Sequence, residues 1–208
     1  PAIELAVRHF EADGGMIITA SHNEPFWNGF KFLGNDGAVL NEKDMHQIIR
    51  NSKNLADFHK IQDRKVLERH NEALKKYSEF IFDIVGKENI EKIRKAGLKI
   101  VLDPNGGAGI AARKILEDAG IEVVGVNMNY GEFNRKVEPT EDSLIYLKNI
   151  IDESRADFAA AFDCDADRVE IMMQTGQSLS GNYILAMAAD EILANIKNPK
   201  SQVVVVND

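Results

Sequence analysis

The chain has 208 residues, 44% of them apolar and 7% aromatic, a composition typical of a packed core and unlike that of a disordered chain. Its 25 Lys and Arg residues against 33 Asp and Glu residues give a net charge of −8, which disfavours nonspecific nucleic-acid binding because phosphate backbones are anionic. No apolar run approaches the roughly 20 residues that a membrane-spanning helix needs, so neither a nucleic-acid nor a membrane partner is expected.

The first third of the chain predicts a pair of strands followed by helices. The apolar run 15–19 predicts a buried strand, and the run 30–33 predicts a short second one. Asn41, with Asp44 three positions later, predicts the N-cap of a helix. Over 64–85, apolar residues at helical spacing predict one long amphipathic helix, with Leu67, Leu74, Tyr77, Ile81 and Ile84 on its apolar face.

The middle of the chain predicts alternating strands and helices. Gly97 is expected to end a helix, and a second helix through Ala111 is expected to end at Gly120. A third begins near Pro139, with Leu144, Leu147 and Ile151 on its apolar face. Strands are expected over 98–102, 121–126, 158–162 and 169–173. We therefore predict an α/β fold of successive βαβ-type domains, with mixed, mainly parallel sheets flanked by helices.

A third unit is expected to begin near Gly181, with a helix through Ile192 and Leu193 and then a strand over 203–206. The chain starts at Pro1 without an initiator Met, and it stops just after this apolar strand. We interpret both ends as cuts in a longer protein.

The strongest chemical signal is a set of three aspartates at alternate positions, Asp163, Asp165 and Asp167. In an extended backbone, residues two apart point to the same side, so the three carboxylates are expected to converge. Such a cluster needs a cation, because two like charges about 4 Å apart repel by roughly 4 kcal/mol at an effective dielectric near 20. Oxygen ligands favour Mg²⁺ or Ca²⁺, and the cluster follows an apolar strand, at the end where open α/β sheets bind ligands.

Two other interpretations compete with a metal site. An EF-hand loop also begins with alternating aspartates, but its required Gly and Glu are replaced here by Arg168 and Gln174, and no helix precedes the loop. A solvated acidic turn between two strands is the second, and the strict alternation of the acids argues against it. Arg168 itself is either an internal counter-ion or a group that grips a phosphate oxygen.

A second polar segment, Ser21-His22-Asn23, follows the first predicted strand. Its hydroxyl could carry a phosphoryl group, and the neighbouring imidazole and carboxamide could bind phosphate or move protons. Lys31 follows shortly and could bring a cation to the same pocket. The same residue types are common in ordinary hydrogen-bonded turns, so spacing alone leaves both interpretations open.

Taken together, these motifs resemble those of the α-D-phosphohexomutases, a superfamily of phosphoglucomutases, phosphomannomutases and phosphoglucosamine mutases. Segments 19–23 and 28–31 resemble its phosphoserine loop, and 163–168 resembles its metal loop. Segment 103–109 resembles the turn that opens its second domain. The three motifs have the family's order and spacing, so the resemblance extends over essentially the whole chain.

The resemblance implies transfer of a phosphoryl group between the 1- and 6-positions of a hexose phosphate, through a phosphoserine enzyme and a hexose 1,6-bisphosphate intermediate. Phosphorylated Ser21 and the three aspartates would hold one Mg²⁺. Arg168 would steady the transferring group, and Asn23 would bind phosphate. His22 and Lys31 would transfer protons and position the sugar hydroxyl.

The resemblance also divides the chain. Residues 1–70 would be the later part of domain 1, 71–176 domain 2 and 177–208 the start of domain 3 in a four-domain family. Because the sugar-recognition loop and the phosphate-binding fourth domain are missing, we expect the fragment alone to be inactive. The sugar (glucose, mannose or glucosamine) and the oligomeric state cannot be read from it. Phosphoglucosamine mutase is the alternative within the family; a metal-dependent phosphatase and a non-catalytic sugar-phosphate binder are the alternatives outside it.

Three residues depart from the family pattern. Glu24, followed by Pro25, stands where the family usually has proline and adds a charge near the phosphate. Cys164 and Ala166 stand where glycine is frequent; we expect Ala166 to be accommodated easily, Cys164 to place a side chain where the backbone needs freedom, and the metal site to persist. Cys164 is also the only cysteine, so no intrachain disulfide can form, and a reducing, cytoplasmic location fits best.

Overall fold

The computed structural model of the protein describes residues 1–53 and 66–195. The chain divides into two compact units, Pro1–Lys92 and Ile93–Asp208, and each is described by itself below. Within the described residues, every helix is too short or too polar to cross a bilayer. The predicted strand over 203–206 lies outside the described residues, and the predicted boundaries of the three family domains stay predictions.

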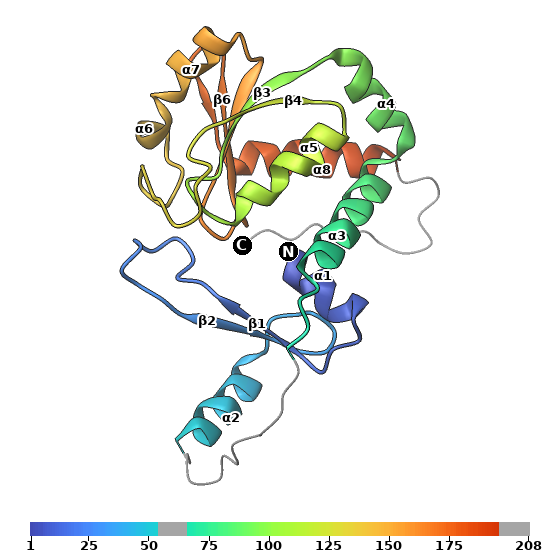
Figure 1. The fold of residues 1–208 in the computed structure, drawn as a ribbon, viewed down its shortest axis with the longest axis vertical. Helices are drawn as coiled ribbons and strands as arrows, with labels where there is room; N and C mark the ends of the chain where they lie inside the picture. Colours follow the sequence, from blue (N-terminus) through green and yellow to red (C-terminus); the bar gives the residue numbers. More distant parts are fainter. Residues whose placement is uncertain (54–65, 196–208) are drawn as a thin grey trace. The chain divides into compact units, whose positions relative to one another are not determined.

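The first unit contains a two-stranded antiparallel ribbon, β1 (Gly15–Ile18) and β2 (Phe30–Leu33), which confirms both predicted strands (Figure 1). The prediction that the first strand is buried is wrong for one of its faces, since Met16 is 50% and Ile18 62% exposed. Successive side chains of a strand point to opposite faces, and only the Gly15 face packs here, against Val7 of α1 (Ala2–His9).

Three further helices lie in or extend from this unit: α2 (Glu42–Ser52), α3 (His70–Val85) and α4 (Lys87–Ala96). The predicted N-cap of α2 is confirmed, since the side chain of Asn41 accepts a 3.1 Å hydrogen bond from the Asp44 backbone N–H. Gly97, with φ +62°, follows the last residue of α4, which confirms the predicted helix stop.

The long helix predicted over 64–85 begins later than expected, at His70. Leu67 lies outside it and is 61% exposed; residues 64 and 65 lie outside the described residues. Arg69, just before the helix, is directed toward the end of α1, where its guanidinium lies 4.1 Å from the centre of the Phe10 ring. It also donates two hydrogen bonds to Glu72 in the first turn of α3. These contacts fix the helix start at the point where α3 packs against α1.

The second unit is built on one mixed sheet with the strand order β4-β3-β5-β6-β7. The strands are β3 (Lys99–Asp103), β4 (Glu122–Gly125), β5 (Phe158–Phe162), β6 (Val169–Met173) and β7 (Ser178–Leu179). β3 is parallel to both β4 and β5, whereas β6 is antiparallel to its two neighbours. The predicted α/β class with a mixed, mainly parallel sheet is confirmed; the two-residue β7 was not predicted.

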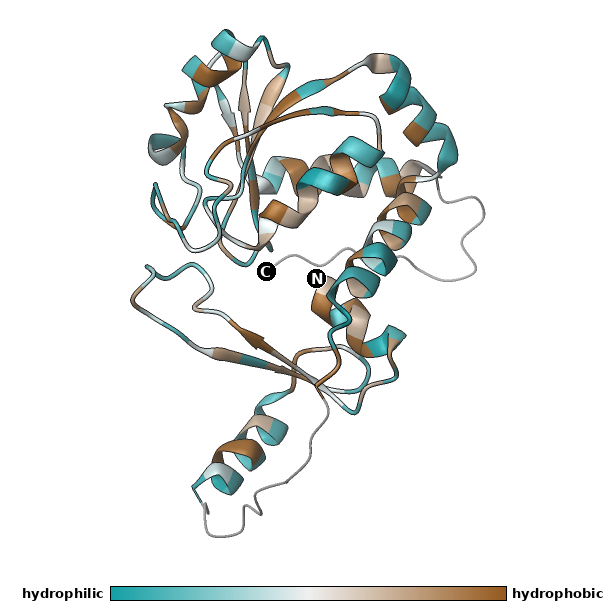
Figure 2. Ribbon diagram, in the orientation of Figure 1, coloured by the Kyte–Doolittle hydropathy of each residue, from teal (hydrophilic) through white to brown (hydrophobic). Residues whose placement is uncertain are grey.

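Helices cover both faces of this sheet (Figure 1). Alternate residues of β3 face opposite sides: Val101 packs with α6 (Glu141–Leu144) and α7 (Leu147–Ser154), whereas Ile100 packs on the side of α5 (Ala112–Asp118). Figure 2 shows β3 and β4 as mainly apolar ribbons and α4 as a mainly hydrophilic helix. The last helix, α8 (Gly181–Asn195), packs against β6 and β7.

The helix predicted to begin near Pro139 is divided in two. Thr140 and Ser143 form a capping box at the start of α6, and α7 begins after a break at Ile145 and Tyr146. The three residues predicted on its apolar face are all buried, which confirms that face: Leu144, Leu147 and Ile151. At the break, the Tyr146 hydroxyl donates a 2.6 Å hydrogen bond to the buried Asp103, a contact described below.

Substitutions at two neighbouring residues test the packing of α6 against the sheet. Leu144 is 0% exposed and Ile145 is 62% exposed. We expect Leu144→Ala to lower the free energy of unfolding by about 2–5 kcal/mol, because it leaves a cavity in the core. Ile145→Ala should change it by no more than about 0.5 kcal/mol. Urea unfolding followed by circular dichroism measures both, and equal losses would show that this face of the helix is not part of the core.

Candidate metal centre

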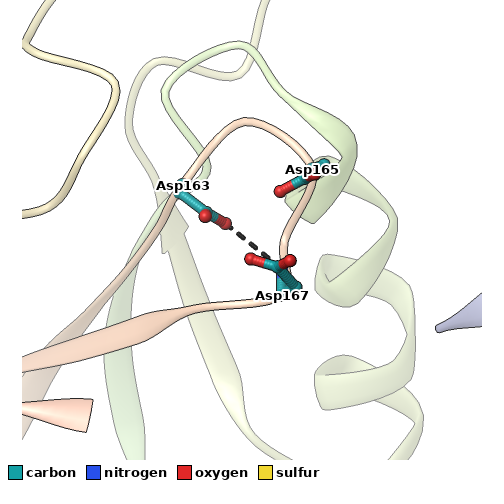
Figure 3. Close-up of side chains that lie close together, drawn as sticks. All are labelled: Asp163, Asp165 and Asp167. Carbon is teal, nitrogen blue, oxygen red and sulfur yellow. Dashed lines mark hydrogen bonds between the residues drawn. The ribbon is translucent and has the colours of Figure 1, made fainter. Parts of the chain in front are cut away.

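Asp163, Asp165 and Asp167 lie in the turn that joins β5 to β6 (Figure 3). One oxygen of each carboxylate lies within 4.8 Å of those of the other two, so the predicted convergence is confirmed. The predicted reason is wrong, because the segment is a tight turn and not an extended strand. The turn is closed by a 3.3 Å hydrogen bond from the Ala166 backbone N–H to the Asp163 backbone oxygen, and Ala166 has a left-handed φ of +59°.

Asp163 organises this turn with its own side chain. Its Oδ1 accepts hydrogen bonds from the backbone N–H groups of Asp167, at 3.1 Å, and Arg168, at 3.2 Å. Its Oδ2 is buried and has no hydrogen-bond partner among the residues that the structure describes. A buried carboxylate oxygen without a partner is unfavourable, and a cation would satisfy it.

The electrostatics of the turn agree with this reading. Burial raises the pKa of the Asp163 carboxyl to about 7, and the negative charges of Asp167 and Asp165 act in the same direction, whereas the hydrogen bond from the Arg168 backbone N–H opposes them. The site thus favours a positive charge, whether a proton or a metal ion. Since all three side chains offer carboxylate oxygens, they fit a hard divalent ion such as Mg²⁺ or Ca²⁺.

The turn that follows β3 packs directly against the metal loop. A Cβ at Gly107 would collide with the backbone of Cys164, and the adjacent Ala108 N–H donates a 2.8 Å hydrogen bond to the Cys164 carbonyl. Gly106 has φ +70°, and a Cβ there would lie 2.5 Å from the Glu132 carbonyl oxygen. Glycine is therefore required at both positions of the Asp103–Gly107 turn.

A buried ion pair lies beside the base of the loop. Arg135 Nε donates to Asp103 Oδ2 at 2.6 Å, with 4% of the arginine side chain and 0% of the aspartate side chain exposed. Asp103 ends β3 and is paired in register with Ala161 of β5. This pair was not predicted from the sequence. Arg135 lies in an irregular polar segment 32 residues away in the chain; the one available signal was an aspartate at the end of an apolar strand.

The predicted catalytic residues of the first unit share its hairpin. Ser21, His22 and Asn23 lie in the loop between β1 and β2, and Lys31 lies on β2. Ser21 is partly buried with a left-handed φ of +55°, and its backbone N–H donates a 2.9 Å hydrogen bond to Thr19 Oγ1. A non-glycine residue in this conformation is strained, and such strain is concentrated at functional sites.

His22 and Asn23 are exposed on this loop. The Asn23 side chain donates a 2.9 Å hydrogen bond to the Ala20 carbonyl, which closes the chain around Ser21. Glu24 is also exposed, and its carbonyl accepts a 3.0 Å hydrogen bond from the Trp27 N–H, so that Pro25 occupies the second position of a tight turn. The predicted meeting of Ser21 with the three aspartates joins the two units and stays a prediction.

The expectation for the glycine-like positions of the metal loop is wrong. Ala166, which was expected to fit easily, is the residue with positive φ, and Cys164 is not among the residues that have one. The turn reverses direction at the fourth residue after β5, so the strain falls on Ala166.

Arg168 is an internal counter-ion in this structure. It forms a 2.6 Å ion pair with Glu138, and about half of each side chain is exposed. The pair lines a depression of about 330 Å³ together with Glu170, Ser180 and Tyr183. Contact with a phosphate group stays a prediction for this residue.

Comparisons with known proteins bear on the chain as a whole. Residues 1–58 match the family model of the phosphoglucomutase/phosphomannomutase α/β/α domain I, and residues 75–176 match that of domain II. A phosphoglucomutase/phosphomannomutase of Thermococcus kodakarensis is 36% identical over 197 residues, which cover 93% of this chain and 42% of the relative. A phosphoglucosamine mutase of Thermodesulfovibrio yellowstonii is 30% identical over 218 residues, which cover 98% of this chain and 45% of the relative.

The fold has solved counterparts as well. The crystal structure of a phosphoglucomutase/phosphomannomutase family protein from Burkholderia thailandensis superimposes with a TM-score of 0.70 at 23% identity, covering 88% of this chain and 38% of that one. This likeness concerns the fold. The chain spans less than half the length of the relatives that it matches.

The stability of the folded protein should depend on both pH and Mg²⁺ through the carboxyl group of Asp163. Because its pKa is raised without a metal, the folded protein should lose stability as pH rises from about 4 to 7, and Mg²⁺ should restore it by about 2.7 kcal/mol at a concentration 100 times its Kd. Asp163→Asn should flatten the pH dependence and abolish the stabilisation by Mg²⁺. Thermal unfolding with Mg²⁺ or EDTA at several pH values measures both effects.

Glu153→Gln is the matched control for this experiment. Glu153 is exposed near the end of α7, so its substitution removes one acidic group outside the cluster of three aspartates. It should leave both effects intact. A wild-type response to Mg²⁺ in Asp163→Asn would contradict the assignment of Asp163 as a ligand.

The strain at Ala166 gives a separate prediction. Ala166→Gly should raise the free energy of unfolding by about 0.5–1 kcal/mol, since a left-handed alanine costs about 1–2 kcal/mol and glycine returns part of this gain as entropy. Ala112→Gly, at φ −64° on α5, should instead lower it by about 1 kcal/mol. Urea unfolding of both variants decides the point, and a loss of stability in Ala166→Gly would show that the turn is not strained there.

Proposed function

The chain belongs to the phosphoglucomutase/phosphomannomutase family, and from this premise we propose that it supplies the phosphoserine loop and the metal loop of a hexose-phosphate mutase. The observation that carries the proposal is the convergence of three carboxylates at the end of β5, where one buried oxygen of Asp163 has no hydrogen-bond partner among the described residues. The relatives named as mutases support the reaction class.

In the proposed reaction, a hydroxyl of the bound sugar phosphate attacks the phosphorus of phosphorylated Ser21. A new O–P bond forms on the sugar oxygen as the hydroxyl gives up its proton, the bond from phosphorus to Ser21 Oγ breaks, and Ser21 Oγ takes up a proton. The bisphosphate then reorients and returns its other phosphoryl group to Ser21. A bound Mg²⁺ would withdraw negative charge from the phosphoryl oxygens.

Each protein group has a task in this scheme. Asp163, Asp165 and Asp167 hold the ion, together with the phosphorylated Ser21. His22 and Lys31 transfer protons and orient the sugar hydroxyl. The strained turn at Ser21, held by Thr19 and closed by Asn23, supports Ser21 as the carrier of the phosphoryl group because these hydrogen bonds hold the backbone from which its hydroxyl projects.

Arg168 and Asn23 are proposed to contact the phosphoryl group. Arg168 must then leave its ion pair with Glu138, and since both side chains are about half exposed, this exchange is energetically small.

The sugar remains a choice between two candidates. A glucose or mannose phosphate is the first, because one relative is named phosphoglucomutase/phosphomannomutase. A glucosamine phosphate is the second, because another is named phosphoglucosamine mutase. For both, we propose a hexose 1,6-bisphosphate as the activator and a cytoplasmic setting. We also propose that the 208-residue chain by itself does not turn over, because it spans less than half the length of the relatives that are named as mutases.

Phosphorylation of Ser21 tests the proposal. After incubation with glucose 1,6-bisphosphate and Mg²⁺, intact-mass and peptide mass spectrometry should show a fraction of molecules heavier by one phosphate, with the group on Ser21. Ser21→Ala should reduce the labelled fraction to background, and Ser52→Ala, an exposed serine of the same unit, should leave it unchanged. Hydrolysis of phosphate esters by a protein that is never labelled would point instead to the phosphatase, and no labelling with unimpaired sugar-phosphate binding to the binding protein.

A further inference from the structure

We propose that Arg135 is a positioning residue for the metal loop, and that its buried ion pair with Asp103 holds the backbone from which Asp163 projects. This inference rests on the proposed function in one respect, namely that the three aspartates hold a metal ion. It adds Arg135, a residue that lies outside the motif of the loop itself.

All five N–H groups of the Arg135 guanidinium have an acceptor. Nε donates to Asp103 Oδ2 at 2.6 Å. Nη2 donates to the Phe162 carbonyl at 2.5 Å and to the Asp103 carbonyl at 3.3 Å. Nη1 donates to the carbonyls of Lys136, at 3.0 Å, and Val137, at 3.4 Å. One side chain thereby links the ends of β3 and β5 to the segment that precedes α6.

Asp103, its partner, is equally well satisfied. Its Oδ1 accepts from the Asn105 backbone N–H at 2.9 Å and from Asn127 Nδ2 at 3.0 Å. Its Oδ2 accepts from the Tyr146 hydroxyl at 2.6 Å in addition to Arg135. Removal of one partner of a buried ion pair strongly destabilises the folded protein, because it leaves an unpaired buried charge. A hydrogen-bond network in which every group has a partner also has one preferred geometry. The pair is therefore a rigid anchor.

This anchor reaches the metal loop from both sides of Asp163. Phe162, whose carbonyl accepts from Arg135, immediately precedes Asp163. Cys164, which follows it, has its carbonyl held by the Ala108 N–H of the turn that Asp103 begins. The carbonyl groups of the residues immediately before and after Asp163 are thus held by groups outside the loop. The direction of the Asp163 side chain, and with it the spacing of the three carboxylates, depends on that support.

Lysine cannot reproduce this arrangement. It carries the same charge but only three donors at a single nitrogen, so it cannot serve Asp103 and the Phe162 carbonyl with the planar fork of a guanidinium. A purely structural role for Arg135 would lower stability without changing the affinity of a folded protein for metal. A positioning role changes that affinity.

Mn²⁺ affinity of the 208-residue chain, measured by isothermal titration calorimetry, separates the two roles. We compare wild type, Arg135→Lys and Ile151→Ala, a core variant of the same unit that loses stability without touching the network. All are measured at a temperature at which circular dichroism shows each to be folded. We expect Arg135→Lys to weaken Mn²⁺ binding about 10- to 100-fold and Ile151→Ala to leave it unchanged.

Wild-type affinity in folded Arg135→Lys, or equal weakening in both variants, would overturn the inference and leave the proposed metal site intact. A wild-type chain that binds no Mn²⁺ would overturn the metal site and the inference with it. Should Arg135→Lys fail to fold, Tyr146→Phe removes one donor to Asp103 and keeps the arginine. Weaker Mn²⁺ binding in this variant supports the inference, and unchanged binding overturns it.

Discussion

Repulsion between three carboxylates in one short turn is the constraint around which the second unit is organised. Their ligand oxygens lie within 4.8 Å of one another, and burial raises the pKa of Asp163 to about 7, so the turn favours a compensating positive charge. The protein opposes this repulsion with backbone donors: Asp167 and Arg168 donate N–H groups to Asp163 inside the turn. A divalent ion would neutralise the negative charge that remains.

The apolar core of the second unit and its polar site act together to position the candidate metal loop. Helices on both faces of the sheet bury β3, and the end of this strand carries Asp103, where Arg135 and Tyr146 converge from the irregular segments that follow. The core fixes the positions of the strand ends, and the polar network fixes the loops that extend from them. In the first unit, a short ribbon presents Ser21 in a strained turn, so both candidate loops depend on local backbone geometry set by neighbouring strands.

Periodicity and turn chemistry were sufficient to predict the four longer strands of the second sheet, the caps at Asn41 and Gly97, and the class of the fold. The convergence of the aspartates was also predictable, although alternation in sequence produced it through a tight turn instead of an extended strand. Arg135 could not be found, because its significance comes from a contact with a strand end far away in sequence. Whether Ser21 reaches the aspartates depends on how two units meet, which no local pattern encodes.

The absence of a Cβ at Gly107 matters for any transfer of the candidate metal centre to another protein scaffold. Because the backbone of Cys164 occupies the space where a Cβ would stand, the metal loop and the Asp103–Gly107 turn are shaped to each other. Grafting the six residues of the loop alone would leave their outer surface unsupported. A working transplant has to carry both segments, and with them the arginine that fastens the two strand ends together.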